Sequence, residues 1–166
     1  MSTVILLRGN SGSGKSTVAK LLQRKLGRGT LLIPQDVIRR ELLWVNDRAG
    51  NPALLLMSEM AKWGAQNREF VIVEGILDSK VYRPLFETLA REFGSVHAYY
   101  YDIPFEETLL RHTTKPNCHE FGEEEMRRWW KEKDFIGFIP EKTIGKDASI
   151  DEVLDMILKD IGFETP

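Results

Sequence analysis

The sequence predicts an α/β fold, a parallel sheet covered by helices on both faces, and two observations lead to it. Short apolar runs of strand length alternate along the chain with segments whose apolar residues recur at helical spacing. The first of these runs is followed directly by a glycine-rich loop and then by a helical segment. Such alternation is typical of parallel strands joined by crossover helices. Because 166 residues suit one core, we expect a single domain over residues 1–166.

The first strand and the first helix flank the glycine-rich loop. Residues 3–8 read Thr-Val-Ile-Leu-Leu-Arg, a run typical of a parallel strand that is buried on both faces. After the loop, Val18, Leu22 and Leu26 recur at helical spacing, and Gly27 marks a helix end. A flexible Gly/Ser linker would have polar flanks, whereas both flanks here are apolar. The loop is therefore predicted to join a buried strand to a helix.

The loop has the spacing of a P-loop, in which Gly9 is followed by four residues and then by Gly14, Lys15 and Ser16. Glycines let successive backbone N–H groups turn inward around phosphate oxygens, and the helix N-terminus adds a positive end. Lys15 would reach the β- and γ-phosphates, and the Ser16 hydroxyl would ligate Mg²⁺. We therefore predict a nucleoside triphosphate site. Its predicted nucleotide-binding residues are Gly9, Asn10, Ser11, Gly12, Ser13, Gly14, Lys15, Ser16 and Thr17.

The rest of the chain continues the alternation of strands and helices. Strands are predicted over residues 31–33, 70–73, 96–101 and, from the weakest pattern, 142–145. Helices are predicted over residues 36–44, 53–67, 82–93 and 105–112, with a loop over residues 46–52. A last helix begins after Ser149, which forms a capping box with Glu152. In sheets of this kind ligands bind beyond the carboxyl ends of the strands, so the polar residues at those ends are the candidates for function.

Asp36 follows the second strand and is the predicted general base. A kinase removes a proton from an acceptor hydroxyl near the γ-phosphate, and a carboxylate within hydrogen-bond reach performs this step. The alternative is that Asp36 caps the helix that begins there. Arg39 lies three residues on and shares a helical face with Asp36. Arg39 either binds an anionic part of the acceptor or pairs with Asp36 and fixes its rotamer.

Glu74 follows the four apolar residues of the third strand, where P-loop proteins often place an acid that holds Mg²⁺ directly or through water. We therefore predict Ser16 and Glu74 as the metal-side residues. The alternative is that Glu74 accepts hydrogen bonds from neighbouring backbone N–H groups. Asp78 is a second carboxylate of the same region and is a weaker candidate.

A basic segment over residues 113–134 follows the helix that ends at His112, and we expect it to form a lid. Lids exclude water and bring Arg or Lys to the transferred phosphate. Arg111, just before the lid, is the first candidate for a catalytic contact at the transition state or beside adenine. Lys115 and Arg127 or Arg128 are the next candidates. The alternative is a solvated face, because acidic residues nearly balance these cations.

The composition excludes several classes of protein. A formal net charge of −2 disfavours a long nucleic acid as a partner, because such proteins usually carry a strong basic surface. The single cysteine, Cys118, forms no internal disulfide, which is typical of a reducing compartment. No apolar stretch approaches the roughly 18 residues of a membrane span, and residue 3 already begins a strand rather than a signal peptide. We expect a cytoplasmic monomer or homodimer that makes no membrane contact.

With these motifs the chain resembles small P-loop kinases of the gluconate kinase, chloramphenicol phosphotransferase, zeta toxin and polynucleotide kinase type. The likeness rests on residues 8–17, 35–39 and 73–75 and on the lid that opens at Arg111, and it is strongest to a group of bacterial predicted kinases. It implies a P-loop NTPase fold, a three-layer α/β/α sandwich whose five parallel strands have the order 2-3-1-4-5. It also implies that Asp36 acts as base and that Arg39 contacts the substrate.

The resulting expectation is an ATP- and Mg²⁺-dependent phosphotransferase that acts on a hydroxyl of a small-molecule acceptor. Lys15, Asp36 and Arg111 are its predicted catalytic residues, and Asp36 and Arg39 its predicted acceptor-binding residues. One alternative is a kinase of nucleic-acid 5′-hydroxyls or nucleotide sugars. A regulatory nucleotide switch is disfavoured, because the chain has no Asn-Lys-x-Asp element for reading guanine. The acceptor itself has no signature in the sequence.

Overall fold

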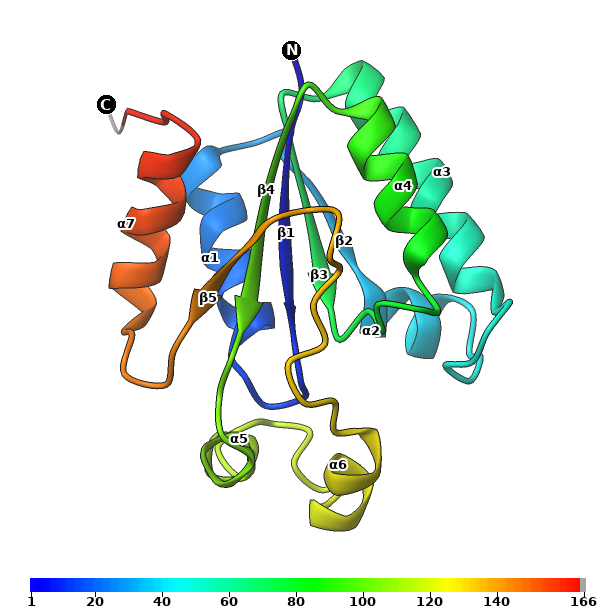
Figure 1. The fold of residues 1–166 in the computed structure, drawn as a ribbon, viewed down its shortest axis with the longest axis vertical. Helices are drawn as coiled ribbons and strands as arrows, with labels where there is room; N and C mark the ends of the chain where they lie inside the picture. The colour runs from blue at the N-terminus through cyan, green and yellow to red at the C-terminus, as the bar shows by residue number, and fades with distance from the viewer. Residues whose placement is uncertain (165–166) are drawn as a thin grey trace.

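The fold is a parallel five-stranded sheet between two layers of helices (Figure 1), in a computed structural model that describes residues 1–164. The strand order β2-β3-β1-β4-β5 confirms the predicted order 2-3-1-4-5. Residues 165–166 of the expected domain lie outside the described residues. The strands are β1 (Thr3–Gly9), β2 (Leu31–Pro34), β3 (Phe70–Gly75), β4 (Ser95–Tyr101) and β5 (Glu141–Ile144). All four strand pairings are parallel, as the crossover helices require.

The central strand β1 shows why both faces of the sheet are covered. Side chains alternate across a strand, so Val4 and Leu6 enter one core while Ile5 and Leu7 enter the other. The first core is closed by α3 (Pro52–Asn67) and α4 (Arg83–Glu92), and the second by α1 (Lys15–Leu26) and α7 (Ile150–Asp160). All four of these β1 side chains are fully buried. An apolar run without alternation therefore corresponds to a strand with helices on both sides.

The helix ends follow local signals in the sequence. α1 ends at Gly27, and α3 begins after Asn51, whose side chain accepts a hydrogen bond from the Ala53 amide. The predicted capping box of α7 is confirmed, with Ser149 and Glu152 each accepting the other's backbone N–H. Two shorter helices, α5 (Phe105–His112) and α6 (Glu123–Trp129), lie beyond the carboxyl ends of the strands (Figure 1). No helix within residues 1–164 has both the length and the hydropathy to cross a membrane.

The segment after β2 differs from the single helix predicted over residues 36–44. It forms one turn, α2 (Gln35–Val37), and then a π-helical turn, η1 (Ile38–Leu42), in which the Leu43 amide donates to the Ile38 carbonyl. The helical path stops before Trp44, which has a positive φ of 51° and a side chain that is 90% exposed. Wide turns of this kind occur often at functional sites. The two turns after β2 carry Asp36, in α2, and Arg39 and Arg40, in η1.

Candidate active site

The P-loop joins β1 to α1 at the carboxyl edge of the sheet, as predicted. Gly12 has a φ of +80° and packs so closely on α5 that a Cβ atom would lie 2.4 Å from the Thr108 carbonyl oxygen. A side chain at this position would therefore both strain the loop and push α5 away. The Ser13 hydroxyl is buried and has no hydrogen-bond partner among the described residues. A buried hydroxyl without a partner in an anion-binding loop is suited to a phosphate oxygen.

Lys15, Ser16 and Glu74 meet beside this loop. Lys15 Nζ donates to the Asn10 carbonyl at 3.1 Å, and Ser16 Oγ donates to Glu74 Oε1 at 3.0 Å. Burial lowers the pKa of Lys15, while the negative charge of Glu74 works in the opposite direction. Burial likewise raises the pKa of Glu74, against the effect of the Lys15 charge. Lys15 and Glu74 are thus both shielded from water. In such surroundings each charge acts strongly on the groups around it.

Ser16 and Glu74 fit the predicted Mg²⁺ site. Both offer oxygen ligands, and Mg²⁺ is usually held by one or two carboxylates together with water and substrate phosphates. Residues 1–164 contain no cluster of three or more His, Cys, Asp or Glu side chains suited to a metal. The alternative of backbone partners for Glu74 is not favoured, since its side-chain hydrogen bond goes to the Ser16 hydroxyl.

Asp36 lies across the site from the P-loop, at the carboxyl end of β2. It does not cap α2, because Pro34 holds the N-cap position and Asp36 lies inside the first turn. Its side chain is 60% exposed, and Oδ1 lies 3.5 Å from Arg39 Nη2 and 4.0 Å from Arg40 Nε. Asp36 lines a cavity of about 500 Å³ that also reaches Ser11 of the P-loop. Its negative charge opposes the lowering of the Lys15 pKa, so the two residues belong to one site.

Arg39 makes the pair with Asp36 that was one of its two predicted roles, while contact with the acceptor stays a prediction. Its Nη1 donates to the Val45 carbonyl at 3.2 Å. Its Nε is buried without a hydrogen-bond partner among the described residues, and the side chain lines the same cavity as Asp36. Asp78, the weaker candidate, lines the same cavity as Asp36 and also holds the local backbone. Its carboxylate accepts from the backbone amides of Lys80 and Val81 and pairs with Lys131 at 2.9 Å.

The lid segment passes beneath the strand ends, as Figure 1 shows for α6 and the chain on either side of it. Arg111, the first candidate among its cations, is fully engaged by protein atoms. It donates to Glu107 at 3.0 Å, to the Ser13 carbonyl at 2.8 Å and to the Lys146 carbonyl at 2.9 Å. The bond to Ser13 holds Arg111 against the P-loop backbone. Its catalytic contact, at the transition state or beside adenine, stays a prediction.

Arg128, one of the predicted lid cations, lines the cavity of Asp36 and Ser11. Lys115 is a lid cation whose charge acts on the residues beside the P-loop. Its side chain is half-buried and makes no ion pair within the described residues. Burial lowers the pKa of Lys115, and the charge of Lys15 lowers it further, while Asp36 and Glu74 oppose both. Arg127 instead pairs with Glu123 at 2.7 Å on the surface of α6. Lys115 therefore joins Lys15, Asp36 and Glu74 in one electrostatic group.

Two positioning roles were missed from the sequence, that of Asn10, which was predicted only as a nucleotide-binding residue, and that of Arg8. The Asn10 side chain donates to the Lys131 carbonyl at 2.7 Å and accepts from the Lys131 amide at 2.8 Å, so it fastens the end of the lid to the P-loop. Arg8 is fully buried and donates twice to the Leu77 carbonyl. It also pairs with Asp134 at 3.0 Å and with Glu141 at 2.7 Å. The available signal was an arginine at the end of an otherwise apolar strand.

Comparison with known proteins places this geometry among P-loop folds. A family model described as an AAA domain matches residues 4–130. The structure is similar to a gluconokinase from Sinorhizobium meliloti, at 19% identity and a TM-score of 0.67 over 99% of this chain and 98% of that one. It is also similar to the tunicamycin resistance protein of Deinococcus radiodurans, at 17% identity and a TM-score of 0.67 over 98% of both chains.

A third similar structure is the APS kinase of Mycobacterium tuberculosis, solved in complex with AMPPNP and APS. It is 19% identical, with a TM-score of 0.63 over 97% of this chain and 98% of that one. At such identities the likeness establishes the fold. A search of curated proteins finds no match. The fold and the P-loop predicted from the sequence are confirmed by the strand order and by the family match.

Proposed function

The chain belongs to the AAA domain family, and from this premise we propose that it is an ATP-dependent kinase that phosphorylates a hydroxyl of a small-molecule acceptor. Kinases among the structures of similar fold support the reaction class. The nucleotide analogue named for the APS kinase complex supports ATP as donor. A net charge of −2 and a single cysteine support a small acceptor and a cytoplasmic location.

The observation that carries the proposal is the arrangement of opposite charges around the P-loop. Lys15 and the Ser16–Glu74 pair lie on one side, and Asp36 opens onto a cavity that reaches the same loop. Lys115 adds a cation that has no ion-pair partner in residues 1–164. Phosphoryl transfer needs little covalent chemistry from the protein, but it needs charge neutralisation and a positioned base. This arrangement offers both.

Asp36 would accept the proton of the acceptor hydroxyl as its oxygen forms a bond to the γ-phosphorus and the bond to the β–γ bridging oxygen breaks. Its pairs with Arg39 and Arg40 would orient the carboxylate. Lys15 and Lys115 would stabilise the charge that spreads over the transferred group, and their burial strengthens that effect. When bound at Ser16 and Glu74, Mg²⁺ would supply further charge neutralisation. A regulatory nucleotide switch needs no general base beside an acceptor cavity, so this arrangement favours a kinase over a switch.

The test is a transfer assay with γ-labelled ATP across sugars, nucleosides, aminoglycosides and 5′-hydroxyl oligonucleotides. Asp36→Asn is expected to lose transfer and to retain binding of Mg·ATP, because the residue acts on the acceptor side. Lys15→Ala is expected to abolish turnover, because the phosphate site loses its buried cation. Lys20→Ala, a change at an exposed position of the same α1, is the matched control and keeps full activity. Normal transfer by Asp36→Asn would remove the base assignment, and labelling of oligonucleotides alone would favour the nucleic-acid-end kinase.

A further inference from the structure

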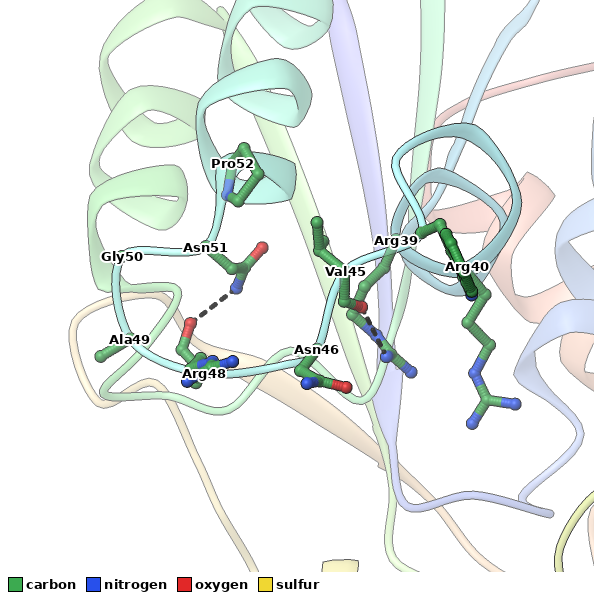
Figure 2. Close-up of a pocket in the computed structure, with 10 residues that line it drawn as sticks. Arg39, Arg40, Val45, Asn46, Arg48, Ala49, Gly50, Asn51 and Pro52 are labelled. Carbon is green, nitrogen blue, oxygen red and sulfur yellow. Dashed lines mark hydrogen bonds between the residues drawn. The ribbon is translucent and has the colours of Figure 1, made fainter.

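A second cavity lies next to the one that Asp36 lines. It has a volume of about 870 Å³ and lies between the helical turn of Arg39 and Arg40 and the loop over residues 44–52 (Figure 2). Arg39, Arg40 and Asn46 line both cavities. The two spaces therefore adjoin, and a molecule whose hydroxyl reaches Asp36 extends naturally into the larger one.

The charge of this second cavity is one-sided. Arg39, Arg40 and Arg48 line it, and no Asp or Glu is among its lining residues. The carboxylate of the nearby Asp47 lines the other cavity and accepts a hydrogen bond from the Tyr82 hydroxyl at 2.8 Å. Asp36 and Glu120 make only long ion pairs, of 3.5 to 4.0 Å, with Arg39 and Arg40, so the three arginines give the cavity a positive potential.

Each arginine keeps donors free for a ligand. Arg39 Nε is buried without a partner in the described part of the chain. Arg40 has only long ion pairs, 4.0 Å to Asp36 and 3.7 Å to Glu120, and its guanidinium lies over the rings of the lid residues Phe121 and Trp129. Arg48 makes no ion pair within residues 1–164, and its side chain is exposed.

The loop that forms the cavity wall is held at both ends. Near its start, the Val45 carbonyl accepts from Arg39. Near its end, the buried Asn51 side chain donates to the Arg48 carbonyl at 2.8 Å and caps α3 through the Ala53 amide; Figure 2 shows the Arg39 and Asn51 bonds as dashed lines. A loop anchored in this way presents a preformed cavity, which lowers the entropy lost on binding.

We propose that this cavity binds an anionic group of the phosphoryl acceptor, a carboxylate or a phosphate ester, while the acceptor hydroxyl faces Asp36. The proposal rests on the proposed function and specifies its substrate class. Guanidinium groups match the planar geometry of a carboxylate and bind phosphate through paired N–H donors. The exposed ring of Trp44 on the cavity rim offers an apolar surface to the carbon skeleton of the same molecule.

The experiment uses acceptors that differ only in the anionic group: glucitol, gluconate and glucitol 6-phosphate, and adenosine with adenosine 3′-phosphate. Binding is measured by calorimetry on the full chain with the nucleotide site saturated by Mg²⁺ and AMPPNP, so that phosphates do not compete for the P-loop. Transfer is measured separately with γ-labelled ATP. We expect binding by at least one anionic compound and none by its neutral counterpart. The carboxylate and phosphate compounds show which anion the cavity prefers.

Arg48→Ala is the diagnostic variant, because Arg48 lies away from Asp36 and the P-loop and is exposed, so its removal leaves folding intact. It is expected to weaken binding of the anionic compound by roughly 10- to 100-fold, the cost of one charge-assisted contact, and to leave the KM for ATP unchanged. Arg28→Ala, an exposed arginine at the opposite edge of the sheet, is the matched control and leaves both unchanged.

The outcomes separate this proposal from the proposed function. Transfer to neutral acceptors as efficient as to anionic ones, or unchanged binding in Arg48→Ala, overturns the anion site and leaves the kinase assignment standing. Anion binding that depends on Arg48 without any transfer supports the cavity and counts against the kinase assignment. Absence of binding by every anionic compound overturns the assignment of the cavity.

Discussion

Arg8 offers the sharpest test of how the site is held together, through the change Arg8→Ala. The Arg8 side chain is fully buried. It contacts Leu77 after β3, Asp134 at the end of the lid and Glu141 in β5. Its partner Glu141 is only 1% exposed. Removal of Arg8 therefore leaves a buried carboxylate without its cation, although the Ile136 amide still donates to Glu141. Breaking a buried pair in this way costs about 3–5 kcal/mol.

That loss is a large part of the roughly 5–15 kcal/mol that stabilises a typical domain. It is measured by urea unfolding followed by tryptophan fluorescence, with the free energy of unfolding obtained by linear extrapolation. Arg83→Ala is the control, because both partners of the Arg83–Glu87 pair are more than half exposed and such pairs contribute about 0–1 kcal/mol. The double change Arg8→Met with Glu141→Leu is expected to recover part of the stability, since the buried Glu141 charge is removed and Asp134, which is 20% exposed, still accepts from the Ser79 amide. A loss in Arg8→Ala no larger than that in Arg83→Ala would refute the reasoning.

Two further predictions concern Lys115 and Tyr82. Lys115→Met is expected to lower kcat by roughly 100- to 1,000-fold with little change in the KM for ATP, because the transferred group loses one stabilising cation. Lys133→Met, at an exposed lid position, serves as control, and equal kinetics of the two variants would contradict the role of Lys115. Burial raises the pKa of Tyr82 to about 12. The contribution of the neutral Tyr82 to the free energy of unfolding is therefore complete below pH 10 and is lost as the pH rises through about 12. Unfolding midpoints at about pH 9 and about pH 11.5 should therefore fall less in Tyr82→Phe than in the wild type, and equal declines would exclude the effect.

The P-loop and the strands could be predicted because their signals are local. Gly9, Gly14 and Lys15 lie within one short segment. A strand buried on both faces appears in the sequence as one continuous apolar run. The pairing of Ser16 with Glu74 could be anticipated as well, because parallel strands end at one edge of the sheet. The turn after β2 could not, because a π-helical turn and a helix share nearly the same apolar spacing.

The sequence alone could not show which lid cation acts on the residues beside the P-loop. Arg111 and Lys115 lie four residues apart, and composition alone ranks an arginine first. In the folded chain Arg111 donates to two backbone carbonyls and to Glu107, whereas Lys115 is half-buried and its charge acts on Lys15, Asp36 and Glu74. The direction of a lid side chain depends on how the lid packs, and no local pattern encodes that.

The sequence by itself determined the fold class, the phosphate-binding loop and the strand ends at which chemistry takes place, because each depends on residues that are neighbours along the chain. Only the tertiary structure decided which lid cations act on the site. It also showed that Asn10 and Arg8 fasten the lid and the neighbouring loops to β1. Finally, it brought three arginines together to line one cavity beside Asp36. Those features join residues up to 133 positions apart, and their energies depend on burial and distance. Burial and distance exist only once the chain has folded.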